Sequence, residues 1–258
     1  MYNIHGMIDR RKSPLEIPVT ESHQCSVDLR LDLLGRVPFF ARLSQDDLKK
    51  INSLFREFGY APDQVIYISG DPGKRLFVVA DGRVRLMRHS LSGKNVLLDL
   101  LQPGEFFGSL STVSGDTYPD TAEAQTQSCI LSIRTDDFRR ILQEHPAVAL
   151  KMLDITGSRL SAAHERVRQL SALPVEGRIA NLLLLLAGKF GERRDVGLLI
   201  QVPLTRDDLA AMAGTTTETA SRVMSQFQRD GLIKTGRQWA AILQRDVLER
   251  IASADTPD

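Results

Sequence analysis

The 258-residue sequence has only two cysteines, Cys25 and Cys129, so it cannot carry a disulfide framework. It has almost no charge excess either: the net charge is +1, so any surface that attracts nucleic acid must be local. No long hydrophobic run is present, because the longest, Leu182 to Ala187, is far shorter than a bilayer requires. The N-terminal residues lack the apolar segment of a signal peptide. These absences predict a protein of the reducing cytoplasm with no membrane association.

Motifs of several enzyme classes are also missing. The sequence contains no phosphate-binding G-x-x-x-x-G-K-S/T loop, no H-E-x-x-H metal motif and no nucleophile elbow. A hydrophobic content of 42% and a charged content of 25% are ordinary for a globular protein, and the length suits one large or two ordinary domains. We therefore expect a non-enzymatic globular protein.

The most informative stretch is Thr215 to Asp230, which has the spacing of an amphipathic helix. Its apolar residues are Ala220, Val223, Met224 and Phe227. Thr215 is expected to cap this helix, with Glu218 completing a capping box, and Gly231 to end it. Thr205 and Asp208 have similar capping spacing at the start of a shorter helix, and Gly214 joins the two. This arrangement predicts a helix-turn-helix motif.

In a helix-turn-helix motif the second helix enters the DNA major groove, and residues near its start contact base edges. Residues 232–242 are expected to form two short strands around a turn, so the motif is interpreted as a winged helix. The candidate DNA-binding residues are Thr216, Thr217, Glu218, Ser221, Arg222 and Arg237. Helix pairs of this kind also occur in cores that never meet DNA, so a motif that binds another protein is the alternative.

Between Val65 and Ile133, short β-rich runs alternate with turn signals, a pattern typical of a jelly-roll barrel. A helix is expected at Ser44 to Phe58, with Leu48, Ile51, Leu54 and Phe55 on its buried face and Gly59 as its end. A long helix is expected from Pro146 to about Leu170. Its stripe of Leu153, Leu160 and Val167 has heptad spacing and indicates a seam between two helices. Residues 1 to about 30 are expected to be a flexible extension that includes the basic cluster 10–12.

The segment GTTTETASRVMSQFQRDGLI resembles the recognition module of the CRP/FNR family of bacterial transcription regulators, and the resemblance extends over roughly residues 37 to 172 as well. The pattern Glu218-x-x-Ser221-Arg222 is similar to the FNR branch, because the CRP branch more often has Arg before the Glu and Gly in place of the Ser. The resemblance implies an α+β chain with four regions. They are an extension (1–36), a cyclic-nucleotide-binding-like jelly-roll sensor barrel (37–144), a dimerisation helix (145–172) and a winged helix-turn-helix domain (173–258).

The resemblance also implies a partner set and a DNA site. The expected partners are double-stranded DNA, a second copy of the chain and RNA polymerase. An FNR-like half-site TTGA is implied, in which Arg222 contacts the guanine, Glu218 the cytosine paired with it, and Ser221 a neighbouring thymine.

The effector is left open by the residues of the barrel. In the cyclic-AMP pattern of the family a Glu holds the ribose, an Arg followed by Ser or Thr holds the phosphate, and a Thr-Ser pair on the long helix contacts the base. Here the ribose position holds Ser109, the phosphate position Asp120 with Thr121, and the base position Ala163 with His164. An aspartate repels a phosphate, so these residues argue against cyclic AMP. Two cysteines are too few for an all-cysteine iron–sulfur cluster. Haem ligation by His89, His145 or His164, an unknown small molecule, and no effector all stay open.

Overall fold

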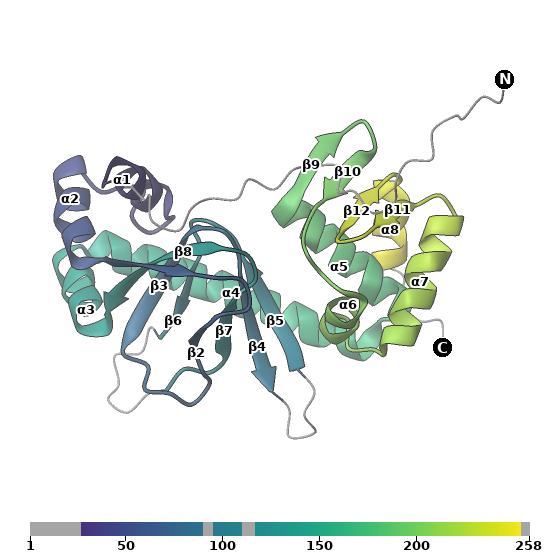
Figure 1. Ribbon diagram of the computed structural model, residues 1–258, viewed down its shortest axis with the longest axis horizontal. Coiled ribbons are helices and arrows are strands. Elements are labelled where there is room, and N and C mark those ends of the chain that lie inside the picture. The colour runs from purple at the N-terminus through teal and green to yellow at the C-terminus, as the bar shows by residue number, and fades with distance from the viewer. Residues whose placement is uncertain (1–26, 90–94, 110–116, 254–258) are drawn as a thin grey trace. The chain divides into compact units, whose positions relative to one another are not determined.

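The computed structural model describes residues 27–89, 95–109 and 117–253 (Figure 1). These residues form two compact units, one within Val19–Ala162 and one within Ala163–Asp258. The N-terminal unit combines strands with covering helices, and the C-terminal unit combines helices with a small sheet. Both are of the predicted α+β kind. The basic cluster 10–12 and Cys25 lie outside the described residues.

The N-terminal unit contains two four-stranded antiparallel sheets, with strand orders β1-β8-β3-β6 and β2-β7-β4-β5. The strands are β1 (Arg56–Tyr60), β2 (Val65–Tyr67), β3 (Arg75–Asp81), β4 (Val84–His89), β5 (Asn95–Leu101), β6 (Phe106–Gly108), β7 (Thr121–Ala124) and β8 (Ser128–Arg134). In the register, Val78 of β3 pairs with Leu131 of β8, and Val84 of β4 with Leu101 of β5. The predicted jelly-roll architecture is confirmed.

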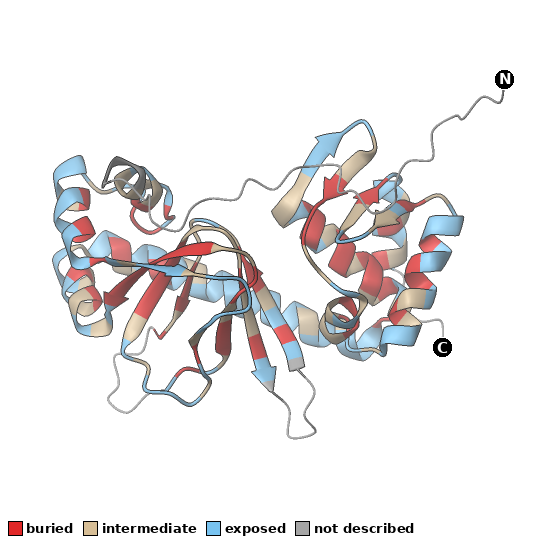
Figure 2. Cartoon of the chain, viewed as in Figure 1, coloured by how far each residue is buried: buried red, intermediate tan, exposed pale blue. Residues whose placement is uncertain are grey.

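Strands β3 and β8 are buried on both faces (Figure 2). Successive side chains of a strand point to opposite faces of the sheet. Phe77 and Ile130 accordingly belong to the apolar cluster between the two sheets. Their neighbours Leu76 and Leu131 belong to a second cluster that the helices complete. The sheet β1-β8-β3-β6 is therefore a middle layer.

Four helices contribute to that second cluster: α1 (Val27–Arg36), α2 (Gln45–Leu54), α3 (Thr135–Glu144) and the beginning of α4 (Pro146–Ala172). On α4, Met152 is buried and Ile155 packs against the same cluster. The Arg159 guanidinium stacks 4.0 Å from the centroid of the Phe106 ring, and its Nη2 donates to the Phe106 carbonyl at 3.0 Å. These contacts hold this part of α4 against β6.

Two helix predictions in this unit need correction. The helix expected to end after Phe58 stops at Leu54, because Phe55 takes an extended conformation and residues 56–60 pair with β8 instead. Gly59 is thus a strand residue, and Leu54 is 37% exposed rather than buried. Residues 27–36, expected within the extension, are the helix α1, and its Leu34 is fully buried. The start of α2 agrees with the prediction, since Ser44 is its cap and its Oγ accepts from the Asp47 N–H at 3.1 Å.

The C-terminal unit is built around α5 (Val175–Phe190), whose Ile179 and Leu183 are buried. The other helices are α6 (Arg206–Met212), α7 (Thr217–Arg229) and α8 (Arg245–Ser253). An antiparallel sheet of order β11-β12-β10-β9 joins β11 (Ile233–Gly236) and β12 (Trp239–Ile242) to β10 (Gly197–Ile200) and β9 (Gly191–Arg194). Asn181 links α5 to α8 by donating from Nδ2 to the Ala252 carbonyl at 2.8 Å.

Among the helices that the structure describes, none has the length and the apolar character needed to cross a bilayer.

Candidate functional site

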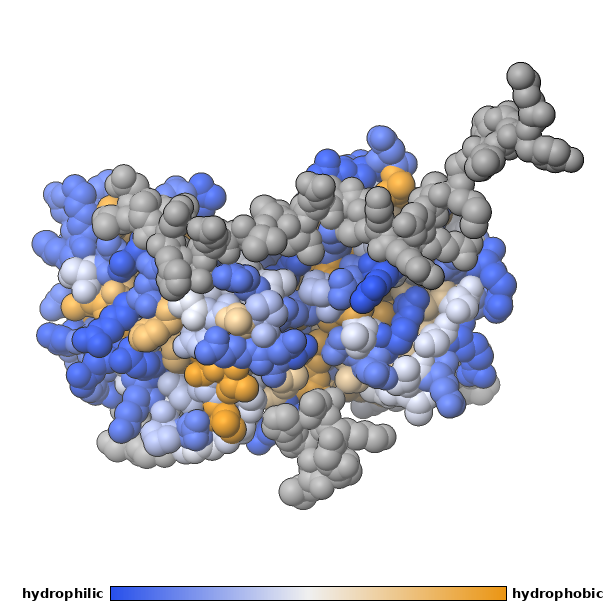
Figure 3. Space-filling view, viewed as in Figure 1, coloured by the Kyte–Doolittle hydropathy of each residue, from blue (hydrophilic) through white to orange (hydrophobic). Residues whose placement is uncertain are grey.

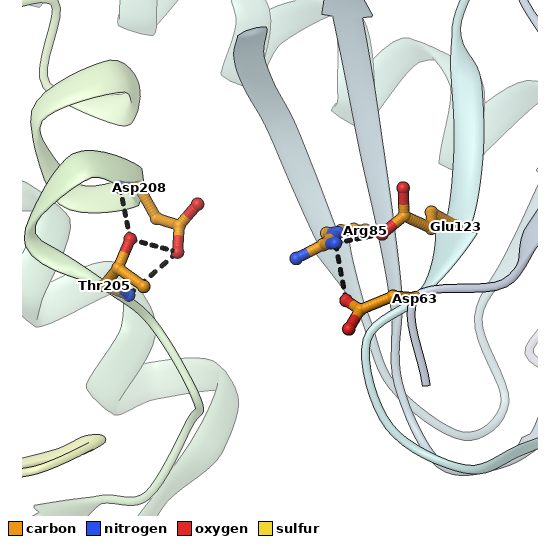
Figure 4. Close-up of polar contacts among 5 residues, drawn as sticks. All are labelled: Asp63, Arg85, Glu123, Thr205 and Asp208. Atoms are coloured by element: carbon orange, nitrogen blue, oxygen red, sulfur yellow. Dashed lines mark hydrogen bonds and ion pairs between the residues drawn. The ribbon is translucent and has the colours of Figure 1, made fainter. Parts of the chain in front are cut away.

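Helices α6 and α7 form the expected helix-turn-helix. At the start of α6, the Asp208 N–H donates to Thr205 Oγ1 at 3.1 Å, and the Thr205 N–H donates to Asp208 Oδ2 at 2.8 Å (Figure 4). This reciprocal pair is the predicted capping box, and it satisfies two backbone N–H groups that the helix leaves unpaired.

The turn between the two helices depends on Gly214. Its φ of +60° lies in the left-handed region, and a Cβ at this position would lie 2.7 Å from the side chain of Leu170. The Gly214 carbonyl accepts from Arg178 Nη1 at 3.0 Å, and the Thr215 N–H donates to the Ala210 carbonyl at 2.9 Å. The angle between α6 and α7 is therefore fixed by backbone contacts.

The start of α7 differs from the prediction by one residue. Thr216, rather than Thr215, is the cap, because its Oγ1 accepts from the Thr219 N–H at 3.2 Å. Thr219, rather than Glu218, occupies the third helical position, so the expected capping box with Glu218 does not form. Glu218 lies in the first turn of α7, where its carboxylate also interacts favourably with the helix dipole.

The two faces of α7 follow the sequence pattern (Figure 2). The four predicted apolar residues are all buried: Ala220, Val223, Met224 and Phe227. Glu218 and Arg222 are exposed, one helical turn apart, and neither has a side-chain hydrogen bond or ion pair within the described part of the chain. Ser221 between them is half-buried.

Two of the candidate DNA-binding residues have contacts inside the motif. Thr216 caps α7, and the Thr217 hydroxyl donates to the Asp207 carboxylate of α6. The outer surface of α7 is thus formed by polar side chains, including the free ends of Glu218 and Arg222. In the space-filling view the region of α7 is mainly white and blue, as expected for a hydrophilic surface (Figure 3).

The wing is the hairpin of β11 and β12, closed by Arg237 and Gln238. Gln238 has a φ of +62°, in the left-handed region, whereas Arg237 before it does not. Arg237 is exposed at the turn, and Thr235 Oγ1 donates to Gln228 Oε1 of α7 at 2.6 Å. The wing and the second helix of the motif are therefore directly connected.

The candidate effector residues of the barrel lie near an aromatic stack. The rings of Tyr67 and Tyr118 are parallel within 19° and 3.9 Å apart between centroids, and Phe77 stacks on Phe107 with centroids 5.2 Å apart. Tyr67 Oη donates to Asp120 Oδ1 at 2.8 Å. Asp120, which we expected at the arginine position of the family's nucleotide pattern, is thus a carboxyl that accepts a hydrogen bond from a tyrosine.

Burial shifts the pKa values of this pair. It raises the pKa of Asp120, an effect that the hydrogen bond from Tyr67 and the nearby Arg88 partly oppose. Burial also raises the pKa of Tyr67, and the charge of Asp120 raises it further. The arrangement keeps the tyrosine neutral and places a carboxyl beside the aromatic stack.

Ser109 and Thr121 are both buried and engaged in the barrel. The Ser109 N–H donates to the Arg75 carbonyl at 3.1 Å, and Thr121 Oγ1 accepts from the Ser69 N–H at 3.1 Å. Neither residue supplies the carboxylate or guanidinium that the ribose and phosphate of a cyclic nucleotide require. Among the described residues, Ser109, Asp120 and Thr121 thus supply no cation for the phosphate of a cyclic nucleotide.

A charged cluster stabilises the second sheet of the barrel. Arg85 of β4 bonds to Asp63 at 2.8 Å and also contacts Glu123 of β7 (Figure 4). Its half-buried guanidinium is neutralised by two carboxylates, so it is not available for an anionic ligand.

The remaining candidate ligands are scattered. His164 is exposed on α4, and His145 follows α3. The side chain of His89 lies outside the described residues. Cys129 is buried in β8, and its thiol contacts Glu57 Oε1 at 3.4 Å. Within residues 27–89, 95–109 and 117–253, no group of three or more metal-ligating side chains comes together.

Helix α4 has a line of exposed apolar side chains. Leu153 is 70% exposed, Leu160 57% and Val167 62%, which are high values for large apolar residues. They recur every seven residues, and Ala149, Ala163 and Leu170 occupy the intervening positions of the heptad pattern.

Comparison with known proteins agrees with this architecture. The family model for the cyclic nucleotide-binding domain matches residues 57–145, and that for the Crp-like helix-turn-helix domain matches residues 177–251. The cyclic AMP receptor protein of Thermus thermophilus is 31% identical over 215 residues, which cover 83% of this chain and 96% of that protein. The transcriptional activator FnrL of Cereibacter sphaeroides is 29% identical over 204 residues, covering 75% and 78% respectively.

The fold is also that of solved structures. FixK2 from Bradyrhizobium japonicum superposes with a TM-score of 0.70 at 24% identity, covering 78% of this chain and 99% of that one. The matched relatives are regulators of transcription, which confirms the expectation of a non-enzymatic, DNA-binding protein. The chain belongs to the CRP/FNR family of transcription regulators.

Proposed function

We propose that the protein acts as a homodimer that reads a palindrome of TTGA half-sites, and that a signal other than cyclic AMP controls it. The proposed recognition of DNA bases depends on Glu218 and Arg222. Both are exposed at the start of α7 and have no partners among the described residues. Arginine can bind guanine O6 and N7 as a fork, and glutamate can accept from cytosine N4. The pair therefore matches the two bases of one G·C pair, and Ser221 between them suits a neighbouring thymine.

Other residues of the motif position the protein on DNA. Arg237 at the turn of the wing is placed to contact a phosphate, while Thr216 and Thr217 act through the cap and the Asp207 contact. Phosphate contacts fix the register of a protein on the duplex, and base contacts supply the specificity. The proposed division assigns specificity to α7 and orientation to the wing.

The homodimer follows from the heptad stripe of α4. A second copy would bury Leu153, Leu160 and Val167, which a lone chain leaves in water. A two-fold dimer presents two recognition helices to successive major grooves, so the half-sites should lie about one helical turn apart. In the cell, such a dimer works in the cytoplasm, where it meets the chromosome and RNA polymerase.

The decisive experiment selects binding sites from random DNA. The wild type should enrich a TTGA palindrome, and Arg222→Ala should cost roughly 1–3 kcal/mol per half-site and lose preference at the guanine. Arg229→Ala is the matched control, because it removes the same charge from the last turn of the same helix. Arg222 has no reading role if its variant keeps the wild-type preference at that guanine.

Cyclic AMP should not regulate this DNA binding. Calorimetry at micromolar concentrations of cyclic AMP should show no binding, because Asp120, at the proposed phosphate position, is a carboxyl rather than a guanidinium. Micromolar binding that tightens the affinity for DNA would contradict the proposal. In the alternative function the helix-turn-helix binds a protein. A gel-shift assay separates the two, since that alternative expects no retarded DNA.

A further inference from the structure

A cavity of about 360 Å³ lies inside the C-terminal unit. Helices contribute Leu183 and Leu186 of α5, Leu209 of α6 and Met224 of α7, and the wing contributes Trp239 and Ala240 of β12. Its size lies within the range of small-molecule sites, and its wall is mostly apolar, as such sites usually are. At roughly 30 Å³ for each water-sized atom, it holds a molecule of about twelve non-hydrogen atoms.

The charges around this cavity have one sign. Arg206 and Arg237 contribute to its wall, and no aspartate or glutamate does. Arg206 is half-buried, and within the described residues its guanidinium has neither a hydrogen bond nor an ion pair. Burial lowers the pKa of Arg206, and no neighbouring carboxylate offsets that cost. An uncompensated, partly desolvated cation beside an apolar space favours an anion there.

The ring of Trp239 belongs to the same wall, but its indole nitrogen is buried against Gly236. Trp239 therefore contributes apolar surface to the cavity, and the charge that an occupant can reach comes from Arg206.

We propose that this cavity binds a small apolar carboxylate, with its carboxylate at Arg206 and its hydrocarbon body against Leu209, Met224 and Trp239. Ion pairing and hydrogen bonding to a guanidinium suit a carboxylate, and the aliphatic wall suits an unbranched or aromatic body of medium length. The site is separate from the aromatic stack of the barrel and from the outer face of α7.

The walls of the site belong to the elements that would contact DNA. Leu209 and Met224 lie on the two helices of the helix-turn-helix, and Arg237 belongs to both the wing turn and the wall. An occupant would therefore fix the wing against α7, next to the Thr235–Gln228 contact. Binding of the carboxylate itself does not depend on the proposed DNA site and is tested without DNA.

The test uses the full-length protein and the fluorescence of Trp239, which is the single tryptophan of the chain. Decanoate, with its ten-carbon chain, is the probe, and decanamide is its uncharged match. We expect a saturable change in emission with decanoate at one equivalent per chain, and binding of decanamide that is at least about tenfold weaker.

Three variants locate the site. Arg206→Gln should weaken decanoate binding about tenfold, because it removes the charge-assisted hydrogen bonds. Ala240→Leu should weaken decanoate and decanamide alike, because it fills the cavity. Arg193→Gln is the matched control, since it removes the same charge from an exposed position of β9 outside the wall and should change nothing.

Three results would overturn the assignment: no saturable change in emission, equal affinity for the acid and the amide, or an Arg206→Gln affinity equal to that of the wild type. Equal weakening by Arg193→Gln would do the same, because it would indicate general attraction to positive charge rather than a site. Circular dichroism of each variant checks that the fold is kept.

Discussion

Asp120 is the residue on which the proposed insensitivity to cyclic AMP depends. We propose that it takes the place of the arginine of the nucleotide pattern; its carboxyl accepts from Tyr67, which belongs to a stack of four aromatic rings. On this proposal the exchange does more than remove a phosphate ligand, because it places a carboxyl where the phosphate would lie. The barrel would then keep the fold of a nucleotide-binding domain without accepting the nucleotide.

The raised pKa of Asp120 predicts a stability effect with a definite sign. The folded state binds this proton more tightly than the unfolded chain, so ionisation of Asp120 destabilises the fold as pH rises through its folded pKa. Asp120→Asn keeps an oxygen acceptor for Tyr67 and removes the charge, so it should raise the free energy of unfolding at pH 7. The gain should shrink as pH falls toward 3.8, the ordinary value for this carboxyl.

Urea unfolding of the wild type and Asp120→Asn at pH 7 and pH 4.5 measures this difference. Tyr67→Phe is the companion variant, because it leaves the carboxylate without its donor and should destabilise the fold most at pH 7. A gain from Asp120→Asn that is equal at both pH values would show that ionisation of Asp120 does not affect stability.

At the scale of elements, the cap of α7 sets which residues face outward. Thr215, Thr216 and Thr217 are consecutive, and only the structure shows that Thr216 accepts the capping hydrogen bond. Thr216→Ala should therefore cost about 1 kcal/mol of stability in the C-terminal unit. Thr215→Ala is the control and should cost less than half of that, because Thr215 contributes a backbone N–H that alanine retains. Denaturant unfolding measures both, and a larger loss at Thr215 would restore the sequence-based assignment.

The helices and strands also differ in how well the sequence predicts them. The periodic helices α4 and α7 were found correctly, because many of their apolar residues repeat at one spacing. The buried strands β3 and β8 were found as short apolar runs between turn signals. Short polar strands were not found. β9 has the sequence Gly-Glu-Arg-Arg, and its pairing with β10 depends on a partner that local periodicity does not reveal. The residues of β1 were taken for the end of a helix. Phe55, just before β1, fits a buried position in a helix as well as in an extended chain, so its apolar character did not show where the helix ends.

The candidate DNA-binding surface was easier to predict than the cavity beside it. Glu218, Ser221 and Arg222 are close in sequence, so helical spacing alone groups them. The cavity joins residues from Leu183 to Ala240, and only the packing of three helices on the sheet brings them together. The partners of Thr217 and Thr235 were missed for the same reason, since Asp207 and Gln228 belong to other elements.

At the scale of the whole molecule, α4 is the element that both compact units share. Its heptad stripe continues from Leu153 in the N-terminal unit to Val167 in the C-terminal unit. Small residues at the intervening positions, such as Ala149 and Ala163, would let two copies of the helix approach closely. A seam along α4 would therefore bring two sensor barrels and two DNA-binding units into one assembly.

This seam predicts the effect of a charge placed in it. Leu160→Asp would bury two unpaired carboxylates where two copies of α4 meet, and breaking an apolar contact this way is strongly destabilising. Light scattering should show the wild type as a dimer and Leu160→Asp as a monomer, with affinity for a palindromic site greatly reduced. Ser161→Asp is the matched control, because it adds the same charge about 100° around the helix at an exposed position. If Leu160→Asp remains a dimer while keeping its fold, the chain associates through another surface, and the spacing of its half-sites must be derived from that surface instead.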